Sequence, residues 1–404
     1  MVDCVMPPQG RTTGSRSDNL EKISAHGVGP ETHGLCLVLF DQTLDTLRPS
    51  KQVSQRMERT MNALAATSLA LIASFFASAQ WAATATAAVS EPPTEAAGVW
   101  RDPSPHRVRF VTGEKNVALE VLDWGGSGRA VVLLAASGCT AHEFDDFAPK
   151  LTDRYHVYGI TRRGFGASGF VAGEYGADLL GGDVLAVIDA LKLSKPVLVG
   201  HSFAGEELST VANRHPHRIA GVVYLEAAYP YAFDNGKGMS MDEFQQIVSE
   251  PQSPPPTAED LASFSALQSY FLRMRGVRWP EAELRQEWEM TSDGVAKRRR
   301  FPGSAILMKG TRKYTDIPVP ALVIFANPHS LGPWVDNNRD DSLRPAIEAY
   351  SSTFEAFTRK QAQALRDAVH TARVVTIPNA NHFVFITNEA QVLREIRGFI
   401  ASLH

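Results

Sequence analysis

The sequence Gly200-His201-Ser202-Phe203-Ala204-Gly205 joins a short apolar run to a stretch with helical spacing. Glycines stand two residues before and three residues after the serine, whereas the strict pattern G-x-S-x-G would place one at position 204. Small residues are needed on both sides of a sharp turn whose central residue has strained backbone geometry. The motif therefore predicts a strand-to-helix turn that presents the Ser202 hydroxyl as a nucleophile.

Apolar runs of strand length alternate with helical stretches on either side of this motif. Such alternation indicates a mostly parallel sheet with helices on both faces. The first two strands, 107–111 and 117–124, are expected to form an antiparallel hairpin. The remaining strands are expected at 130–136, 156–161, 196–200, 219–225, 321–325 and 373–377, and the helices at 141–151, 177–191, 203–214, 344–370 and 389–403.

The interval 229–318 interrupts this alternation. It contains helical patches, a proline-rich run at 251–256 and a basic cluster at 297–300. We expect this insertion to form a cap that selects the substrate. The apolar candidates for that selection are Phe244, Phe264, Tyr270, Phe271 and Trp279.

A serine hydroxyl becomes a strong nucleophile only when a base removes its proton. His382 is the candidate base, because it lies in a polar loop between the last apolar strand and the last helix. The oxyanion formed by attack on a carbonyl needs two backbone N–H donors. Phe203, directly after the serine, is expected to supply one, and Ser137, in the loop after the strand at 130–136, the other.

Four stretches of the sequence form a recognisable set: LDWGGSG at 122–128, TAHEFDDFAP at 140–149, TRRGFGAS at 161–168 and the serine motif at 200–205. Together they resemble the alpha/beta-hydrolase superfamily, in its capped branch that includes epoxide hydrolases and haloperoxidases. The resemblance covers about residues 105–403 and implies the α/β-hydrolase fold: a mostly parallel eight-stranded sheet, helices on both faces and an inserted helical cap. Members with aspartate at the nucleophile position are epoxide hydrolases or dehalogenases, and Ser202 argues against both activities.

The family usually places the acid of its catalytic triad after the penultimate strand, where this chain continues without a carboxylate as Phe325-Ala326-Asn327-Pro328-His329. The third member of the triad is therefore open. Glu226 is one candidate, because it ends the strand at 219–225 next to the serine strand. The loop that begins at Asn327 offers three others, Asp336, Asp340 and Asp341.

These residues predict a serine hydrolase that cleaves a carboxylic ester, or a related acyl bond, of a small to medium substrate through an acyl-enzyme. The same fold supports C–C hydrolases, lyases and cofactor-free haloperoxidases, which are alternatives. A catalytically inactive binding protein on this fold is an alternative of another class. Acyl transfer to water by a serine needs neither a metal nor an organic cofactor, so neither is expected.

Residues 57–88 have the pattern of a secretory signal peptide. Arg59 provides a positive start, Leu64–Phe76 is an uncharged apolar run, and small residues at 83–87 form cleavage sites. Cleavage there predicts a periplasmic or secreted protein. If the segment were retained, its uncharged length would instead anchor the protein in a membrane.

The rest of the chain divides into three further parts. Residues 1–56 show no sustained periodicity, and we expect them to be unstructured or to precede the true translation start. Residues 89–105 are expected to be a linker, and residues 106–404 the hydrolase domain.

The composition fits a globular protein, with 44% hydrophobic and 21% charged residues. A formal net charge of -4 provides no basic field for nucleic acid or anionic lipid. The expected partner is a small ester-like molecule, with no nucleic acid and no stable membrane association after signal cleavage. Of the three cysteines only Cys139 follows the signal segment, which excludes an intramolecular disulfide and a cysteine-rich zinc site from the mature chain. Cys139 is either a small buried apolar residue or a pocket-lining thiol.

Overall fold

The computed structural model describes residues 100–171, 173, 175–299 and 304–403. The expected leader at 1–56 and signal segment at 57–88 lie outside the described residues, as does most of the expected linker. Among the helices that are described, none combines the length and the apolarity needed to span a membrane.

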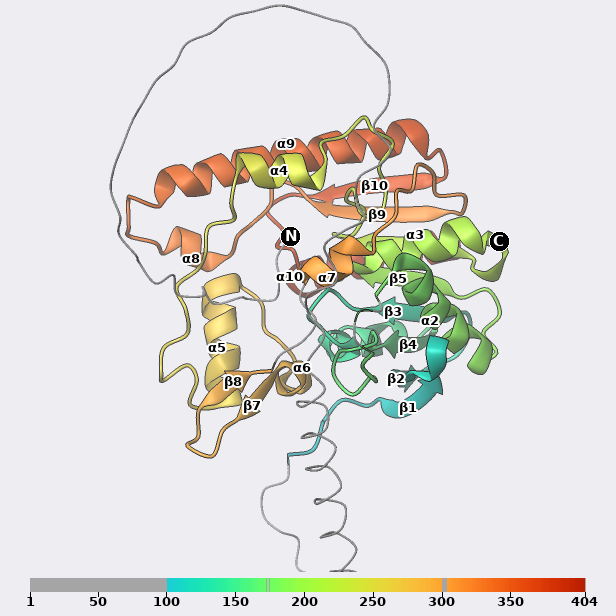
Figure 1. The fold of residues 1–404 in the computed structure, drawn as a ribbon, viewed down its shortest axis with the longest axis horizontal. Helices are drawn as coiled ribbons and strands as arrows, with labels where there is room; N and C mark the ends of the chain where they lie inside the picture. The colour runs from blue at the N-terminus through green and yellow to red at the C-terminus, as the bar shows by residue number, and fades with distance from the viewer. Residues whose placement is uncertain (1–99, 172, 174, 300–303, 404) are drawn as a thin grey trace, which may run out of the picture. The chain divides into compact units, whose positions relative to one another are not determined.

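Eight strands form one sheet in the order β1-β2-β4-β3-β5-β6-β9-β10 (Figure 1). Their bounds are β1 Arg107–Thr112, β2 Ala118–Gly125, β3 Ala130–Leu134, β4 His156–Ile160, β5 Val197–His201, β6 Gly221–Leu225, β9 Ala321–Ala326 and β10 Ala372–Ile377. Strand β2 pairs antiparallel with β1 and with β4, and the other pairs are parallel. The predicted hairpin and the mostly parallel eight-stranded sheet are confirmed.

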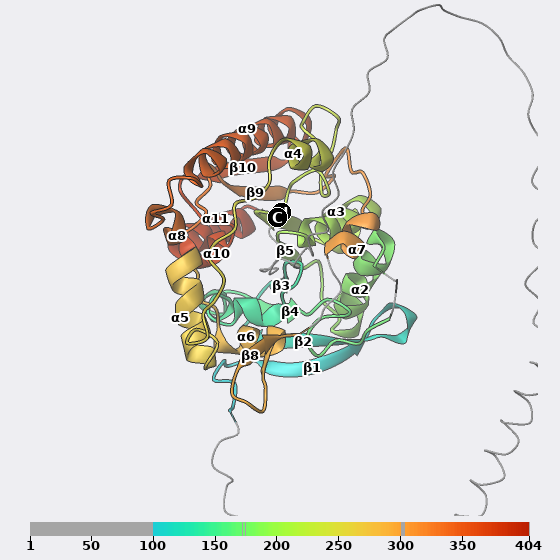
Figure 2. The same cartoon turned by 60° about the vertical axis from the view of Figure 1, so that its left-hand side comes forward.

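Helices cover both faces of the sheet. They include α2 Ala177–Ala190, α3 Ala204–Arg214, α9 Arg344–Ala368, α10 Val384–Thr387 and α11 Glu389–Ala401. Figure 2 shows α2 and α3 on one side of the strands and α10 and α11 on the other. Alternate residues of β3 enter the two cores: Val132 and Leu134 join the core that contains residues of α2, α3 and α9, whereas Val131 and Leu133 join the core of α11. A strand covered on both faces must be apolar throughout, which explains its continuous apolar sequence.

The prediction of a helix at 141–151 is wrong. The structure has two short 3-10 turns instead, Ala141–Phe144 and Ala148–Leu151. Pro149 has no N–H to donate to the Asp145 carbonyl, so a continuous α-helix would lose a bond there. In addition, the Glu143 carboxylate accepts a hydrogen bond from the Ala136 amide at 3.1 Å, which ties the first turn to the end of β3.

The interval 229–318 contains strands as well as helices. Its elements are α4 Met241–Ile247, α5 Phe264–Arg275, α6 Glu281–Glu287, β7 Trp288–Met290, β8 Ala296–Arg298 and α7 Ser304–Lys309. Strands β7 and β8 form a small antiparallel sheet that the sequence pattern did not predict. Helix α4 lies along α9, where Phe244 stacks on Phe357, while α5, β7 and β8 gather elsewhere (Figure 1). The insertion therefore reaches the body of the domain at more than one place.

The turn between β5 and α3 leaves no space for a side chain at Gly205. A Cβ there would lie 1.9 Å from the backbone carbonyl oxygen of Ala227. This contact explains why a glycine stands at position 205, while the position that the strict motif reserves for glycine holds Ala204.

We expect Gly205→Ala to lower the free energy of unfolding by about 3 kcal/mol, because two backbone segments would have to separate. Gly176→Ala is the matched control, since Gly176 precedes α2 with a φ of -71° and has nothing within 4 Å of the added Cβ. That change should cost less than about 1 kcal/mol. Urea unfolding measures both variants, and equal costs would contradict the close approach.

Candidate active site

Ser202 lies at the sharp turn that joins β5 to α3. Its φ of 53° is in the left-handed region, which a serine rarely adopts. Its amide donates a hydrogen bond to the carbonyl of Leu225 at 3.0 Å, so the turn is tied to the end of the neighbouring strand β6. Only 5% of the residue is exposed. Backbone strain of this kind gathers at functional sites, where the surrounding structure maintains it.

Glu226 directly follows β6 and has similar backbone geometry, with a φ of 50°. The residue is completely buried. One carboxylate oxygen, Oε1, accepts a hydrogen bond from the Ala326 amide at 2.5 Å, and Oε2 accepts one from the Tyr229 hydroxyl at 3.1 Å. Burial raises the pKa of the carboxyl, while the charge of His329 and these hydrogen bonds oppose the rise. Glu226 is thus a buried carboxyl whose position is fixed by two hydrogen bonds.

His382 lies in the loop between β10 and α10. Its Nδ1 is 3.5 Å from Oε2 of Glu226. Its backbone carbonyl accepts a hydrogen bond from Nε2 of His201 at 3.1 Å, which helps to hold the loop. Nε2 of His382 is buried and has no hydrogen-bond partner among the described residues. That nitrogen is available to take a proton, and His382 lines the same pocket as Ser202.

None of the three aspartates considered as alternatives to Glu226 forms an ion pair or hydrogen bond with His382 in the structure. Asp336 ends helix α8, Pro333–Asp336, and is exposed. Asp340 is exposed and accepts hydrogen bonds from Ser342 within its own loop. Asp341 is exposed and pairs with Arg344 at 2.8 Å. Of the four carboxylates, the structure places Glu226 beside the imidazole.

Arg162 connects the two predicted oxyanion donors, Phe203 and Ser137. Its guanidinium donates to the carbonyls of Ala135 and Ala136, at 2.7 and 2.9 Å, just before Ser137. It also forms a bidentate pair with Glu207 of α3, at 2.7 and 2.8 Å. Phe203 precedes α3, whose first N–H groups have no partner within the helix. A buried arginine therefore fixes the loop of Ser137 to the helix that begins beside Phe203.

Two pockets meet at His382 and His329, which line both of them. The smaller has a volume of about 370 Å³ and contains Ser202. Its other lining residues are aromatic or apolar: Tyr229, Tyr231, Met241, Tyr350, Phe354 and Phe357. The wall beside the serine is therefore largely apolar.

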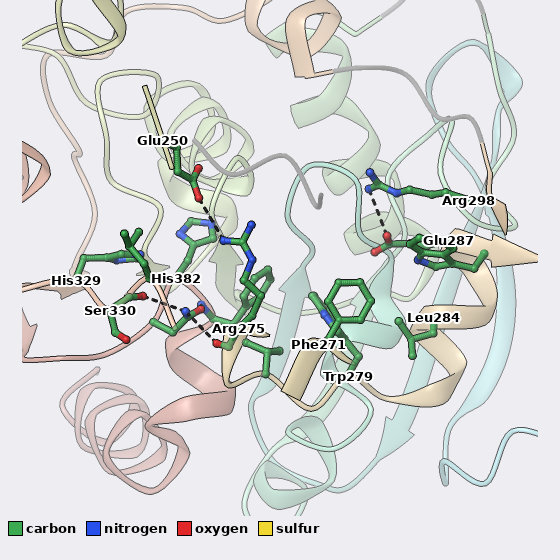
Figure 3. A pocket seen from close by; sticks show the side chains of 15 residues that line it. Glu250, Phe271, Arg275, Trp279, Leu284, Glu287, Arg298, His329, Ser330 and His382 are labelled. Atoms are coloured by element: carbon green, nitrogen blue, oxygen red, sulfur yellow. Dashed lines mark hydrogen bonds and ion pairs between the residues drawn. The ribbon is translucent and has the colours of Figure 1, made fainter. Parts of the chain in front are cut away.

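The larger pocket, about 600 Å³, lies between the two histidines and the insertion (Figure 3). Phe271 and Trp279, two of the predicted cap residues, line it. The other three cap candidates, Phe244, Phe264 and Tyr270, are buried in the cores. The charged residues that line the pocket are paired: Arg275 is 3.3 Å from Glu250, and Arg298 is 3.4 Å from Glu287.

Cys139 is completely buried and lies behind this pocket rather than in its lining. Its sulfur lies within 4.8 Å of a carboxylate oxygen of Glu283 and of one of Glu287, and Glu287 does line the pocket. Burial raises the pKa of Glu287 to about 7, although Arg298 opposes the rise. This pair of buried carboxyl groups could not be predicted from the sequence, because the residues around it come from other segments.

Two further residues of the site, Tyr231 and His329, were not among the predicted site residues. Tyr231 lines the same pocket as Ser202. His329 has its Nδ1 3.7 Å from the same Glu226 oxygen that lies near His382, and burial lowers the pKa of His329 to about 4. His329 follows β9, the place where an acid is usual in the family, so its position in the sequence was the available signal.

The pKa of His382 predicts activity at mildly acidic pH. Burial lowers this pKa well below 6.5, and the charge of His201 lowers it further. A base works only when it is unprotonated, so activity should be lost only as the pH falls below the ordinary histidine range. We expect the acidic midpoint of kcat/KM, measured with a p-nitrophenyl ester, to lie below 6.5. A midpoint at or above that value would contradict a buried, neutral His382.

A family model described as "Alpha/beta hydrolase family" matches residues 131–395. Among curated proteins, the putative carbamate hydrolase RutD of Caulobacter segnis is 34% identical over 27% of this chain and 42% of its own length. The non-heme chloroperoxidase of Burkholderia pyrrocinia is 25% identical over 56% of this chain and 84% of its own. The chain spans about half or less of the length of several curated relatives that it matches.

The crystal structure of E-2-(acetamidomethylene)succinate hydrolase is similar in fold. Its TM-score is 0.51 at 19% sequence identity, over 74% of this chain and all of that chain. The family match covers the strands from β3 onward, together with Ser202, Glu226 and His382. The chain belongs to the alpha/beta hydrolase family.

Proposed function

We propose that this protein is a serine hydrolase that cleaves a carboxylic ester, or a related acyl bond, through an acyl-enzyme. One observation carries the proposal: a strained serine shares a pocket with His382, whose Nδ1 is 3.5 Å from the buried carboxyl of Glu226. A nucleophile, a base and an acid that orients the base are the parts that serine hydrolases on unrelated folds have in common, arranged in space rather than in a fixed chain order.

In the proposed reaction, Oγ of Ser202 attacks the acyl carbonyl while its proton moves to Nε2 of His382. Glu226 stabilises the imidazolium that forms. The positive charge on the imidazole in turn favours the carboxylate form of Glu226. The amides of Phe203 and Ser137 donate to the oxyanion. His382 then gives its proton to the leaving alcohol, and a water molecule, activated by the same imidazole, releases the acid and regenerates the serine.

The two pockets suggest where the two parts of an ester would bind. The smaller pocket, which contains Ser202, offers aromatic walls to an apolar group. The larger pocket offers more volume, and its charged groups are paired. We propose an uncharged substrate with a compact apolar group on the serine side and a bulkier group under the insertion.

A fluorophosphonate probe tests the proposal directly, because it reacts covalently only with an activated serine. We expect one label per chain, located at Ser202 by peptide mass spectrometry. The Ser202→Ala variant is the control and should remain unlabelled. If the folded protein took up no probe, a binding module on the same fold would be the better description.

A cofactor-free haloperoxidase activity is the second candidate, because the relative from Burkholderia pyrrocinia is named a non-heme chloroperoxidase. A haloperoxidase halogenates its substrate only when halide and peroxide are present, whereas ester hydrolysis needs neither. We expect hydrolysis of p-nitrophenyl esters to exceed halogenation in rate, and the reverse order would favour the second candidate.

Export of the protein is also proposed, from the signal-like segment at 57–88. N-terminal sequencing of protein from the periplasm or the medium would locate the cleavage site. Protein retained in the membrane with this segment attached would instead support an anchor.

A further inference from the structure

A cluster of four potential metal ligands lies outside both pockets. Asp102 and His106 precede β1, while His142 and Asp145 lie in and directly after the first 3-10 turn, Ala141–Phe144. One ligand atom from each of the four lies within 4.8 Å of each of the others. Sequence reasoning missed this cluster because it searched for cysteine-based sites, and the two pairs of ligands come from separate segments.

The separations within the cluster suit tetrahedral coordination. Nδ1 of His142 is 2.8 Å from an oxygen of Asp145 and 3.3 Å from an oxygen of Asp102. Nδ1 of His106 is 2.9 Å from an oxygen of Asp145, whereas its other ring nitrogen, Nε2, is 3.6 Å from an oxygen of Asp102, so His106 would have to turn one nitrogen toward the ion. Four ligands at about 2.0–2.1 Å from a zinc ion would be separated by roughly 3.3 Å. The observed values lie on both sides of that separation, so small side-chain movements would complete the site.

The surroundings resemble the outer shell of a metal site. Oδ1 of Asp145 accepts hydrogen bonds from the Ser104 hydroxyl at 2.8 Å and from the indole N–H of Trp124 at 3.1 Å, which fix the carboxylate. The second ring nitrogen of His142, Nε2, faces a carboxylate oxygen of Glu120 at 3.9 Å. A carboxylate behind a histidine is the usual means of orienting it toward a metal ion.

Burial and charge point to a divalent cation. The side chains of His106, His142 and Asp145 are at most 5% exposed, whereas that of Asp102 is 22% exposed and provides a way in. Metal binding requires both imidazoles in their neutral form, and in that form the four ligands would carry two negative charges, which a divalent ion would balance. Imidazole and carboxylate ligands together suit zinc and related transition metals better than calcium.

We propose that Asp102, His106, His142 and Asp145 bind one Zn²⁺ ion as a closed structural site. The ion would fasten the segment before β1 to the turn at 141–144. Glu143 in that turn holds the Ala136 amide at 3.1 Å and lies 3.4 Å from Nδ1 of His201, whose other nitrogen supports the loop of His382. Zinc would therefore stabilise the framework of the active site without touching the substrate.

The test uses untagged protein stripped with a chelator and titrated with Zn²⁺ by calorimetry. We expect one Zn²⁺ per chain and a higher Tm in its presence. His106→Ala and the milder Asp102→Asn should each weaken binding at least tenfold. His156→Ala is the matched control, because His156 also pairs with an aspartate, Asp123 at 2.8 Å, but belongs to no four-ligand cluster. It should bind Zn²⁺ as the unaltered protein does.

X-ray absorption of the zinc-loaded protein gives a readout that does not depend on the folding of a variant. We expect nitrogen and oxygen ligands at about 2.0–2.1 Å, with scattering from two imidazoles. A sulfur ligand at about 2.3 Å would place the ion at the other candidate cluster, Cys139 with Glu283 and Glu287, and overturn the proposal. No uptake of Zn²⁺, or equal uptake by the His106 variant, would also overturn it.

Discussion

Ser202→Ala should reduce kcat for ester hydrolysis by about 10⁴- to 10⁶-fold. The substitution removes the atom that forms the acyl bond, and Phe203, the other residue of the turn between β5 and α3, has no nucleophilic side chain. The substrate pockets are unchanged except for the loss of one hydroxyl, so substrate binding should persist. Initial rates with a graded series of p-nitrophenyl esters measure the effect, and burst-phase kinetics should show no acyl-enzyme in the variant.

The Tm of Ser202→Ala is the control for folding. Alanine at a φ of 53° is strained much as serine is, so the Tm should change by only a few degrees. A variant that remains folded and keeps more than a tenth of the activity would show that Ser202 is not the nucleophile. The proposed function would then fail, whatever the status of the zinc site.

Most of the fold was predictable because turn and loop residues separate its strands in the sequence. Buried strands such as β5 and β9 appear as uninterrupted apolar runs, since both faces of the sheet are covered. The segment at 141–151 was misassigned because its apolar spacing fits a helix, whereas the hydrogen bonds that Glu143 and Asp145 accept from other segments, together with the proline at 149, decide its conformation. Long-range contacts of that kind leave no periodic signal.

The site was predictable in part, for a related reason. Ser202 and His382 stand at strand ends, and parallel strands place their carboxyl ends at one edge of the sheet, so their proximity follows from topology. Tyr231 and Arg162 could not be found in this way. Tyr231 comes from the loop after β6, and the role of Arg162 depends on bonds to Ala135, Ala136 and Glu207 that only the folded chain assembles.

Glu226→Gln should lower kcat by about 10³- to 10⁴-fold, as expected when the acid that orients a catalytic histidine loses its charge. Glutamine keeps the size of the side chain and an oxygen that can accept from the Ala326 amide, so the fold should persist. The change removes the negative charge that would stabilise the imidazolium of His382. Asp336→Asn, Asp340→Asn and Asp341→Asn are the controls, and each should retain activity within about twofold, because these side chains are exposed.

The division of the loss between kcat and KM decides whether Glu226 acts through the histidine. Glu226 does not line either pocket, so its replacement should leave KM nearly unchanged. Full activity in Glu226→Gln, or an equal loss in one of the aspartate variants, would reject the assignment. His329→Asn adds a further comparison, because His329 also lies 3.7 Å from Glu226. We expect His329→Asn to reduce kcat only slightly, because His201 supports the loop of His382 and not that of His329. A loss of kcat as large as that of Glu226→Gln would instead indicate that His329 is the base.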